Sequence, residues 1–202
     1  MANLTKSNPQ SIFTPDGNSL AVFIDSDGLM KFKDVLGNIA LLSEFTPLLK
    51  YGSFFSTETQ SATTINTPKA MTLNETDISN GVSFSKINNS QISVSTSGTY
   101  NLQFSAQIDR VVGTGTDVID IWLRKQGVDV PNTNTKVTIA GNVNQAKVIA
   151  SWNFFISLNA GEYVELMYSV TDLQIQLIYE APNLSTPHPA TPSLLLTMNK
   201  IS

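Results

Sequence analysis

The chain has 202 residues, of which 41% are hydrophobic, and a formal net charge of −4. Its 12 Lys and Arg residues are scattered without a basic run, which argues against a surface that follows nucleic-acid phosphates. Cysteine is absent, so disulfides and thiolate metal sites are excluded, and burial together with self-association has to stabilise the fold.

The beginning of the chain carries no targeting signal that we can identify. Residues 1–11 lack the basic and apolar regions of a secretory signal, and the longest apolar runs further along have the length of a strand. We therefore expect synthesis in a cytoplasm, no membrane partner and, from the charge pattern, no nucleic-acid partner.

Residues 1–50 differ from the rest because turn signals separate very short extended segments. The signals are Asp16-Gly17, residues 25–28 (Asp-Ser-Asp-Gly) and Gly37-Asn38, which suit the backbone angles that turns require. The segments between them, 20–24, 29–35 and 39–45, predict a small β-meander. Because isolated hairpins are marginally stable in water, this meander should pack against a copy of itself, the main domain or another protein.

From residue 51 onward the pattern is that of an all-β domain. Short segments with alternating apolar and polar residues follow one another, and none shows a convincing helical period. The predicted strands are 51–57, 70–74, 82–86, 118–124, 137–140, 147–158, 163–170, 173–179 and 194–198. We predict an antiparallel two-sheet jelly roll or a related barrel over residues 51–202, preceded by the N-terminal meander or arm of residues 1–50.

The clearest alternation lies between residues 91 and 109. Every odd position is polar, and Gly98 separates two runs whose apolar side chains occupy even positions: Ile92, Val94, Tyr100, Leu102, Phe104, Ala106 and Ile108. This pattern predicts a β-hairpin with one face in the core and the other face in water or against a partner. The outward face consists mainly of Ser, Thr, Asn and Gln, which offer hydrogen bonds but little acid–base chemistry.

Candidate catalytic and metal-binding residues are few. His188 is the only histidine and lies between two prolines, so a catalytic triad or a multi-histidine metal site is not available. Asp25-x-Asp27-Gly28 lacks the remaining ligands of a calcium loop, and a turn explains it better. Carboxylate pairs three residues apart, at 117/120 and 162/165, face opposite sides of a strand. We expect no catalytic residue, no cofactor and no metal, and a protein that is not an enzyme.

Several aromatic residues fall on the outward side of predicted strands. Phe55, Phe155 and Tyr163 occupy outward positions of their strands. Trp122 is outward as well, because Ile119, Ile121 and Leu123 occupy the other face of its strand. They predict an interface, although a bulge could equally return them to the core. Together with Leu195 of the last strand, these four aromatic residues are the candidates for a subunit interface.

Several segments resemble the jelly-roll domain of bacteriophage virion proteins, which is similar to the complement globular head and to the tumour-necrosis-factor-like fold. The resemblance covers residues 51–201. Its motifs are Tyr51-Gly52-Ser53-Phe54-Phe55, residues 80–82 (Asn-Gly-Val), 97–107 (Ser-Gly-Thr-Tyr-Asn-Leu-Gln-Phe-Ser-Ala-Gln), 122–127 (Trp-Leu-Arg-Lys-Gln-Gly) and 158–162 (Leu-Asn-Ala-Gly-Glu). The segment 192–196 (Pro-Ser-Leu-Leu-Leu) fits the closing strand, which in the family usually lies where three subunits meet.

The resemblance implies a homotrimer whose N-terminal segment attaches to a virion, either to the capsid, as in decoration proteins and head fibres, or to the tail, as in adhesins. Our leading hypothesis is a capsid decoration protein or head fibre on the capsid surface. Its partners would be other copies of itself and the major capsid protein or another virion protein. The N-terminal residues expected to anchor it are Ile12, Phe13, Leu20, Val22, Ile24, Leu29 and Phe32.

Two other functions remain open at this point. A tail-fibre or receptor-binding adhesin would contact host surface glycans through the polar loops 111–116 and 130–135, but neither loop contains an aromatic residue on which a sugar could stack. A capsule depolymerase would require a carboxylate pair that the sequence does not present.

Overall fold

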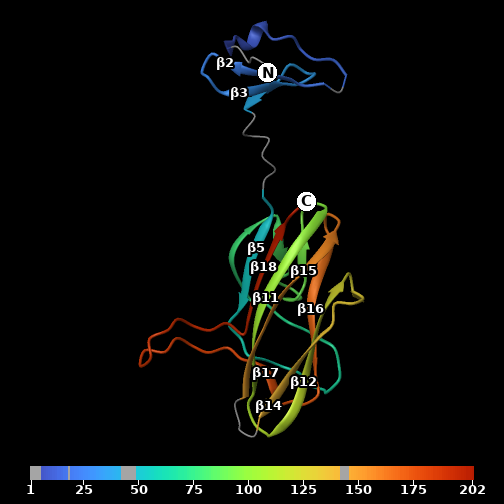
Figure 1. Cartoon of the computed structure of the whole chain (residues 1–202), viewed down its shortest axis with the longest axis vertical. Helices are drawn as coiled ribbons and strands as arrows, with labels where there is room; N and C mark the ends of the chain where they lie inside the picture. The colour runs from blue at the N-terminus through green and yellow to red at the C-terminus, as the bar shows by residue number, and fades with distance from the viewer. Residues whose placement is uncertain (1–5, 18, 42–48, 142–145) are drawn as a thin grey trace. The chain divides into compact units, whose positions relative to one another are not determined.

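The computed structural model describes residues 6–17, 19–41, 49–141 and 146–202. The chain divides into two compact units, Met1–Leu48 and Leu49–Ser202, whose strands are labelled in Figure 1. The segment 42–45 of the third predicted N-terminal strand lies outside the described residues. No helix in the described ranges is long and apolar enough to cross a bilayer.

The N-terminal unit contains one small sheet in the order β1-β2-β3-β4. Its elements are β1 (Lys6–Ser7), the short 3-10 helix η1 (Pro9–Ser11), β2 (Ala21–Asp25), β3 (Met30–Lys33) and β4 (Ile39–Leu41). The three strands β2, β3 and β4 form the predicted antiparallel meander, and β1 adds a parallel edge to β2.

The second unit is a sandwich of two sheets, which we call sheet I and sheet II. Sheet I has the order β6-β17-β11-β18-β5-β8, with β15 on the other edge of β11. Its strands are β5 (Tyr51–Ser56), β6 (Gln60–Ser61), β8 (Glu75–Asn80), β11 (Gly98–Arg110), β15 (Ala146–Leu158), β17 (Ile175–Leu177) and β18 (Leu194–Lys200).

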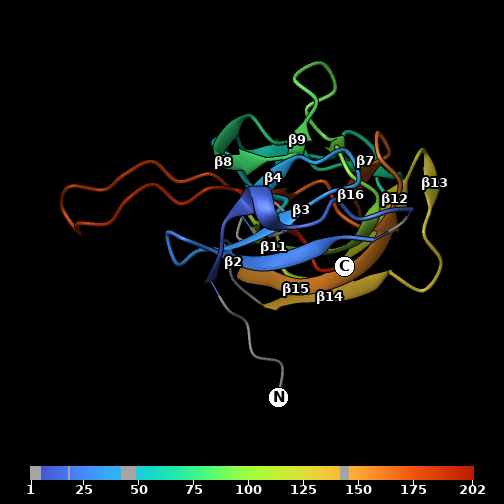
Figure 2. The same cartoon turned by 90° about the horizontal axis from the view of Figure 1, so that it is seen from above.

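Sheet II has the order β13-β12-β16-β10-β9, with β14 paired to β12 and β7 paired to β16. Its strands are β7 (Lys69–Ala70), β9 (Val82–Phe84), β10 (Ile92–Val94), β12 (Gly115–Lys125), β13 (Val128–Asp129), β14 (Thr135–Gly141) and β16 (Tyr163–Val170). Figure 2 shows β14 and β15 side by side along one edge and β8 and β9 at the opposite edge. The predicted all-β two-sheet jelly roll is therefore confirmed.

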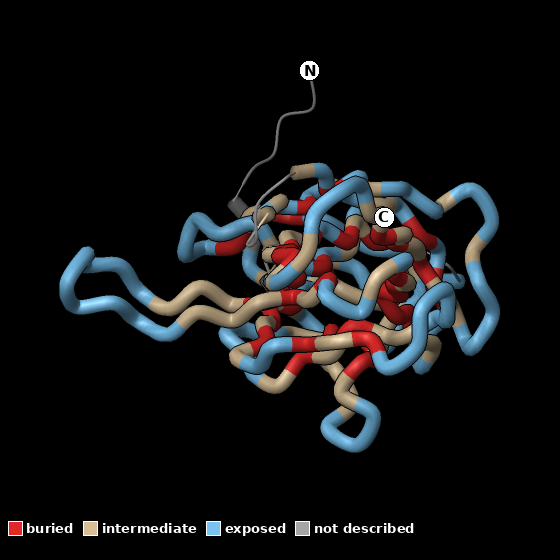
Figure 3. Tube along the Cα trace, turned by 90° about the horizontal axis from the view of Figure 1, so that it is seen from below, coloured by how far each residue is buried: buried red, intermediate tan, exposed pale blue. Residues whose placement is uncertain are grey.

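The core lies between the two sheets, and Figure 3 shows the buried residues gathered in the interior of the molecule. The even-numbered side chains of β11, among them Leu102 and Phe104, meet the odd-numbered side chains of β12, such as Ile121. Trp152 packs edge-on against Phe104, with ring centroids 4.7 Å apart. This alternation follows directly from the two-residue period of the sequence.

The predicted hairpin between residues 91 and 109 is wrong. Strand β10 pairs with β9 and β16 in sheet II, whereas β11 pairs with β15, β17 and β18 in sheet I. Residues 95–97 carry the chain from one sheet to the other. A sandwich buries the inner faces of both sheets, so two strands with the same inward parity can lie on opposite sides of the core.

Strand β8 was absent from the sequence prediction. All but its last residue, Asn80, are exposed, and Ile78 is its only large apolar side chain. It forms by backbone pairing at the edge of β5, where a register shift lies between Ser53 and Phe54. Apolar periodicity does not reveal an edge strand that is held mainly by its backbone.

Arg110, at the end of β11, ties the two sheets together through a fully buried guanidinium group. Its Nη1 donates to the carbonyl oxygen of Gly115 and to Asp117 Oδ2, both at 3.0 Å, and its Nη2 donates to the carbonyl oxygen of Gly141 at 2.8 Å. Because Arg110 belongs to sheet I and its three partners belong to sheet II, one side chain fixes how this end of the sandwich closes.

Tyr168 of β16 supports a stability prediction. Its side chain is fully buried, its hydroxyl has no hydrogen-bond partner among the described residues, and burial raises its pKa to about 12. Replacing Tyr168 by Phe should increase the free energy of unfolding by about 1 kcal/mol, because a buried hydroxyl without a partner is destabilising. Urea unfolding at neutral pH measures this change, and a less stable variant would contradict it.

The same hydroxyl predicts a dependence on alkaline pH. The pKa of Tyr168 is higher in the folded chain than the value of about 10 expected in the unfolded chain. Its contribution to stability is therefore complete below about pH 10 and is lost as the pH rises toward 12. The free energy of unfolding, measured across this pH range, should decrease more steeply with pH for the wild type than for Tyr168→Phe.

Candidate interaction surfaces

One face of the N-terminal sheet is apolar and carries exposed side chains. The register places Val22 beside Phe32, which lies beside Ala40, and it pairs Ile24 with Met30. We call these five residues the N-terminal apolar face. Phe32 at its centre is buried, whereas Val22 is 48% exposed and Met30 is also exposed. Exposed apolar side chains gathered on one face of a small sheet are typical of a binding surface.

The opposite face of the same sheet is covered by the chain segment that precedes it. Lys33 Nζ donates to the carbonyl oxygen of Ile12 at 2.8 Å, and Pro15 is buried. Ala21 and Phe23, whose side chains point to this face, are buried as well. The segment therefore covers this side of the sheet, whereas Val22 and Met30 on the N-terminal apolar face are exposed.

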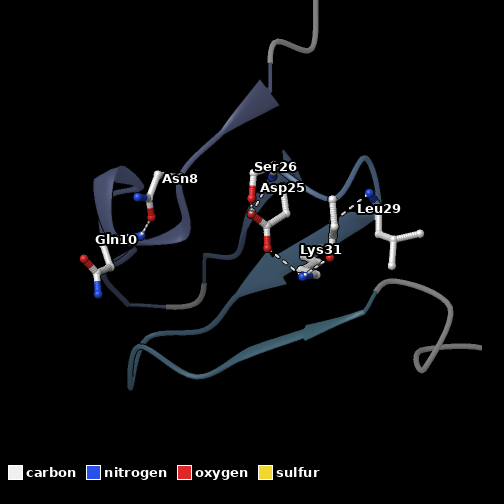
Figure 4. A network of polar contacts seen from close by, with 7 residues as sticks. Asn8, Gln10, Asp25, Ser26, Leu29 and Lys31 are labelled. Carbon is white, nitrogen blue, oxygen red and sulfur yellow. Dashed lines mark hydrogen bonds and ion pairs between the residues drawn. The ribbon is translucent and has the colours of Figure 1, made fainter.

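The turn between β2 and β3 is held by an ion-pair network, drawn in Figure 4. Lys31 Nζ lies 2.6 Å from Asp25 Oδ2 and 2.7 Å from Asp27 Oδ2, and Gly28 adopts a left-handed φ of 84°. The hydrogen bond from Lys31 is the main reason that the pKa of each carboxyl group lies below its usual value. Both carboxylates thus stabilise the predicted turn through their ion pairs with Lys31.

The seven residues predicted to anchor the chain are distributed over this unit. Val22, Ile24 and Phe32 belong to the N-terminal apolar face, while Phe13, Leu20 and Leu29 lie in the connecting segments. Phe13 is 74% exposed, Leu20 and Leu29 are exposed, and Ile12 is half-buried. Phe32 is too buried to meet a partner without a rearrangement of the sheet.

Three of the five candidate interface residues lie on the outer face of sheet I. Leu195 of β18 pairs directly with Phe55 of β5, and Phe155 lies on β15 at the edge of the same sheet. Phe155 is 66% exposed and Leu195 is 42% exposed. Phe155 lies opposite Asn101 of β11, whereas Leu195 lies opposite Ser105, so polar side chains separate Phe155 from the Phe55–Leu195 pair. We call the outer face that carries these three residues the sheet I patch.

The other two candidates lie elsewhere. Trp122 of β12 and Tyr163 of β16 have the opposite parity to the core residues of their strands and therefore project from the outer face of sheet II. The structure does not bring them together with the sheet I patch. A single flat interface could not include all five residues, because the two outer faces of a sandwich point in opposite directions.

A hollow of about 180 Å³ lies between the end of β11, the start of β15 and the connection that follows β17. It is lined in part by Asp109, Lys147 and Glu180. Asp109 is buried, and burial raises the pKa of its carboxyl group. Lys147 forms an ion pair with Glu180, and this pair is the main reason that the pKa of Lys147 is raised and that of Glu180 is lowered. The sequence did not reveal this cluster, because its members lie far apart along the chain.

His188 lies in a long connection that projects from the jelly roll in Figure 1. Two isolated antiparallel β-bridges join the two arms of this connection, one between Glu180 and Thr191 and one between Asn183 and His188. The side chain of His188 is exposed, and its Nδ1 lies 2.7 Å from the carbonyl oxygen of Pro189. Within the described ranges, no three His, Cys, Asp or Glu side chains are grouped so that they could hold a metal ion.

No family model matches the chain, and no curated protein matches it. Two crystal structures of murine APRIL, at pH 8.0 and pH 8.5, are similar to it. Each alignment has 12% sequence identity and covers 76% of this chain and 99% of the APRIL chain, with TM-scores of 0.47 and 0.46. At this identity the likeness concerns the jelly-roll fold alone.

Proposed function

We propose that the chain is a non-enzymatic structural protein of a bacteriophage particle, a homotrimeric capsid decoration protein or head fibre. Its N-terminal unit binds the capsid, through the major capsid protein or another virion protein, and its jelly roll is displayed on the particle. The motifs of residues 51–201 that resemble phage virion jelly rolls support this proposal.

The single observation that carries the proposal is the exposure of Val22 and Met30 on the N-terminal apolar face. One side of this small sheet is closed by its own chain, whereas Val22 and Met30 on the other side remain exposed. A sheet of this size gains little stability from its own burial, so a partner that covers the apolar face would stabilise it.

In the first experiment, the purified chain is mixed with phage particles or empty capsids. The particles are then pelleted and imaged by cryo-electron microscopy. Density repeated over the capsid lattice would support a decoration role. Density only at the tail would contradict capsid binding and favour adhesion to a host, and a chain that stays in the supernatant would contradict particle attachment altogether.

The contact surface can be tested with substitutions that leave the jelly roll intact. The double change Phe13→Asp and Val22→Asp should weaken particle binding at least about tenfold, because each charge would have to be buried at the contact. Phe32→Asp is unsuitable, since this side chain is buried within its own sheet and the change would unfold it.

The matched control is Ile87→Asp, because Ile87 is 92% exposed and belongs to the jelly-roll unit. It should bind particles like the wild type, and all variants should keep the melting temperature of the jelly roll. Full binding by the double variant would contradict the assignment of the contact to the N-terminal unit.

A further inference from the structure

A second surface feature lies on the outer face of sheet II, where a shallow hollow of about 360 Å³ opens over β12. Its lining includes Asp120, Trp122, Asp129, Asn132, Asn134 and Ser169. These residues come from β12, β13, the loop 130–134 and β16. The volume falls within the range of roughly 300–1,000 Å³ that is typical of small-molecule sites.

The strand pattern explains why these side chains point away from the core. Ile119, Ile121 and Leu123 of β12 are buried between the sheets, so Asp120 and Trp122 project to the outside. Asp120 is also paired in register with Ser169 on the neighbouring strand β16. The floor of the hollow is therefore a rigid sheet surface.

The indole of Trp122 is held in a fixed orientation. Its Nε1 donates to Asp129 Oδ1 at 2.8 Å, and Arg124 Nε donates to the same oxygen at 2.8 Å. The hydrogen bond from Arg124, followed by that from Trp122, holds the pKa of Asp129 below its usual value, so the carboxylate stays charged and keeps the indole in place. The ring is partly exposed beside the hollow.

The loop 130–134 that forms the wall is also fastened to β12. Val130 N donates to the carbonyl oxygen of Leu123 at 2.9 Å, and Leu123 N donates to Thr133 Oγ1 at 3.1 Å. The hydroxyl of Thr133 in turn donates to the carbonyl oxygen of Val130 at 2.7 Å. The hollow is thus formed before any ligand arrives, which reduces the entropy lost on binding.

The rim offers hydrogen-bonding groups of both kinds. Asn134 Nδ2 donates to Asp120 Oδ1 at 2.7 Å, and the described contacts leave Asp120 Oδ2 available. Asn132 is exposed and supplies a further amide, with a left-handed φ of 62°. Carboxylate oxygens accept hydrogen bonds from hydroxyl groups, while amides both donate and accept them.

We propose that this hollow binds a neutral saccharide, with one sugar ring packed on the indole of Trp122 and its hydroxyl groups hydrogen-bonded to Asp120, Asn132 and Asn134. The face of a pyranose ring that carries C–H groups is apolar and packs well on an aromatic ring, while its edge is rich in hydroxyl groups. The combination of one fixed aromatic ring with a polar rim matches both features.

The charges of the site exclude other classes of ligand. Two carboxylates, Asp120 and Asp129, lie in the lining, so a phosphate or an acidic sugar would be repelled. Lys136 Nζ, 3.8 Å from Asp120 Oδ1, and Arg124 offset these charges without making the hollow positive. A wholly apolar ligand would leave these polar groups desolvated. This site is independent of the proposed particle attachment.

The loop sequences by themselves argued against such a site, because loops 111–116 and 130–135 contain no aromatic residue. The structure supplies the missing ring from a strand. Trp122 precedes the second loop in sequence, and both line the same hollow. The sequence assigned Trp122 to a subunit interface, and the experiment below distinguishes that role from sugar binding.

The test uses the full chain and the fluorescence of Trp122. The chain has two tryptophans, so Trp152→Phe leaves Trp122 as the sole indole. This variant is titrated with lactose, cellobiose, N,N′-diacetylchitobiose and, as an acidic comparison, sialyllactose. We expect at least one neutral sugar to change the Trp122 emission and to receive saturation transfer in NMR, and sialyllactose to bind more weakly.

Substitutions in the otherwise wild-type chain then locate the site. Trp122→Ala should lower the affinity for the sugar about tenfold or more, as measured by saturation-transfer NMR. Asp120→Asn, which keeps the shape of the side chain, should weaken it by a smaller factor. Tyr179→Ala, which removes an aromatic ring outside the hollow, should leave affinity unchanged.

Three outcomes would overturn the proposal. They are the absence of binding by every neutral sugar, unchanged affinity in Trp122→Ala, and loss of self-association in Trp122→Ala. The last result would assign this face to a contact between copies of the chain.

Discussion

Replacing Arg110 by alanine is expected to lower the free energy of unfolding of the Leu49–Ser202 unit by about 3–5 kcal/mol. The guanidinium is fully buried and is the group that links sheet I to Asp117, Gly115 and Gly141 of sheet II. Without it, the carboxylate of Asp117 loses its charged partner, two carbonyl oxygens lose their donors, and a cavity opens in the core.

Urea unfolding and thermal melting measure this loss, and the melting temperature should fall by roughly 10 °C in a unit of this size. A double-mutant cycle separates the ion pair from the packing. Arg110→Met together with Asp117→Asn should recover part of the stability, because neither charge is then left without its partner. A single Arg110→Ala variant that is as stable as the wild type would contradict the role of this side chain as the link between the sheets.

The second large effect is expected on self-association. The proposed homotrimer should sediment at three times the chain mass of 21.9 kDa. Phe155→Asp combined with Leu195→Asp should reduce association about 100-fold or more, because each change replaces a large apolar contact by a charge on the sheet I patch. Sedimentation equilibrium would then show the mass of a single chain.

The same control residue is useful here, since Ile87→Asp also adds a charge at an exposed apolar position of the jelly roll. It should sediment like the wild type. If the double variant remains trimeric while it is folded, the subunits meet through another surface, and the outer face of sheet II with Trp122 and Tyr163 becomes the next candidate. A wild-type chain that sediments as a monomer would contradict the proposed trimer.

The sequence by itself determined the fold class and the orientation of most side chains. Alternation on one strand depends only on the geometry of an extended backbone, so Tyr100, Phe104 and Tyr168 could be assigned to the core from local pattern. The turns of the N-terminal meander were predictable for a similar reason, since Asp25-Ser26-Asp27-Gly28 satisfies its own backbone through short-range hydrogen bonds.

Only the tertiary structure decided which strands pair and which distant residues meet. The same inward parity fits either sheet, so the separation of β10 from β11 could not be derived from their sequences. The polar edge strand β8 carries almost no apolar signal, and it forms because β5 offers unpaired backbone groups. Long-range pairing likewise brings Trp122 to the loop 130–134 and Arg110 to the carbonyl oxygen of Gly141. Local sequence pattern does not encode such pairing.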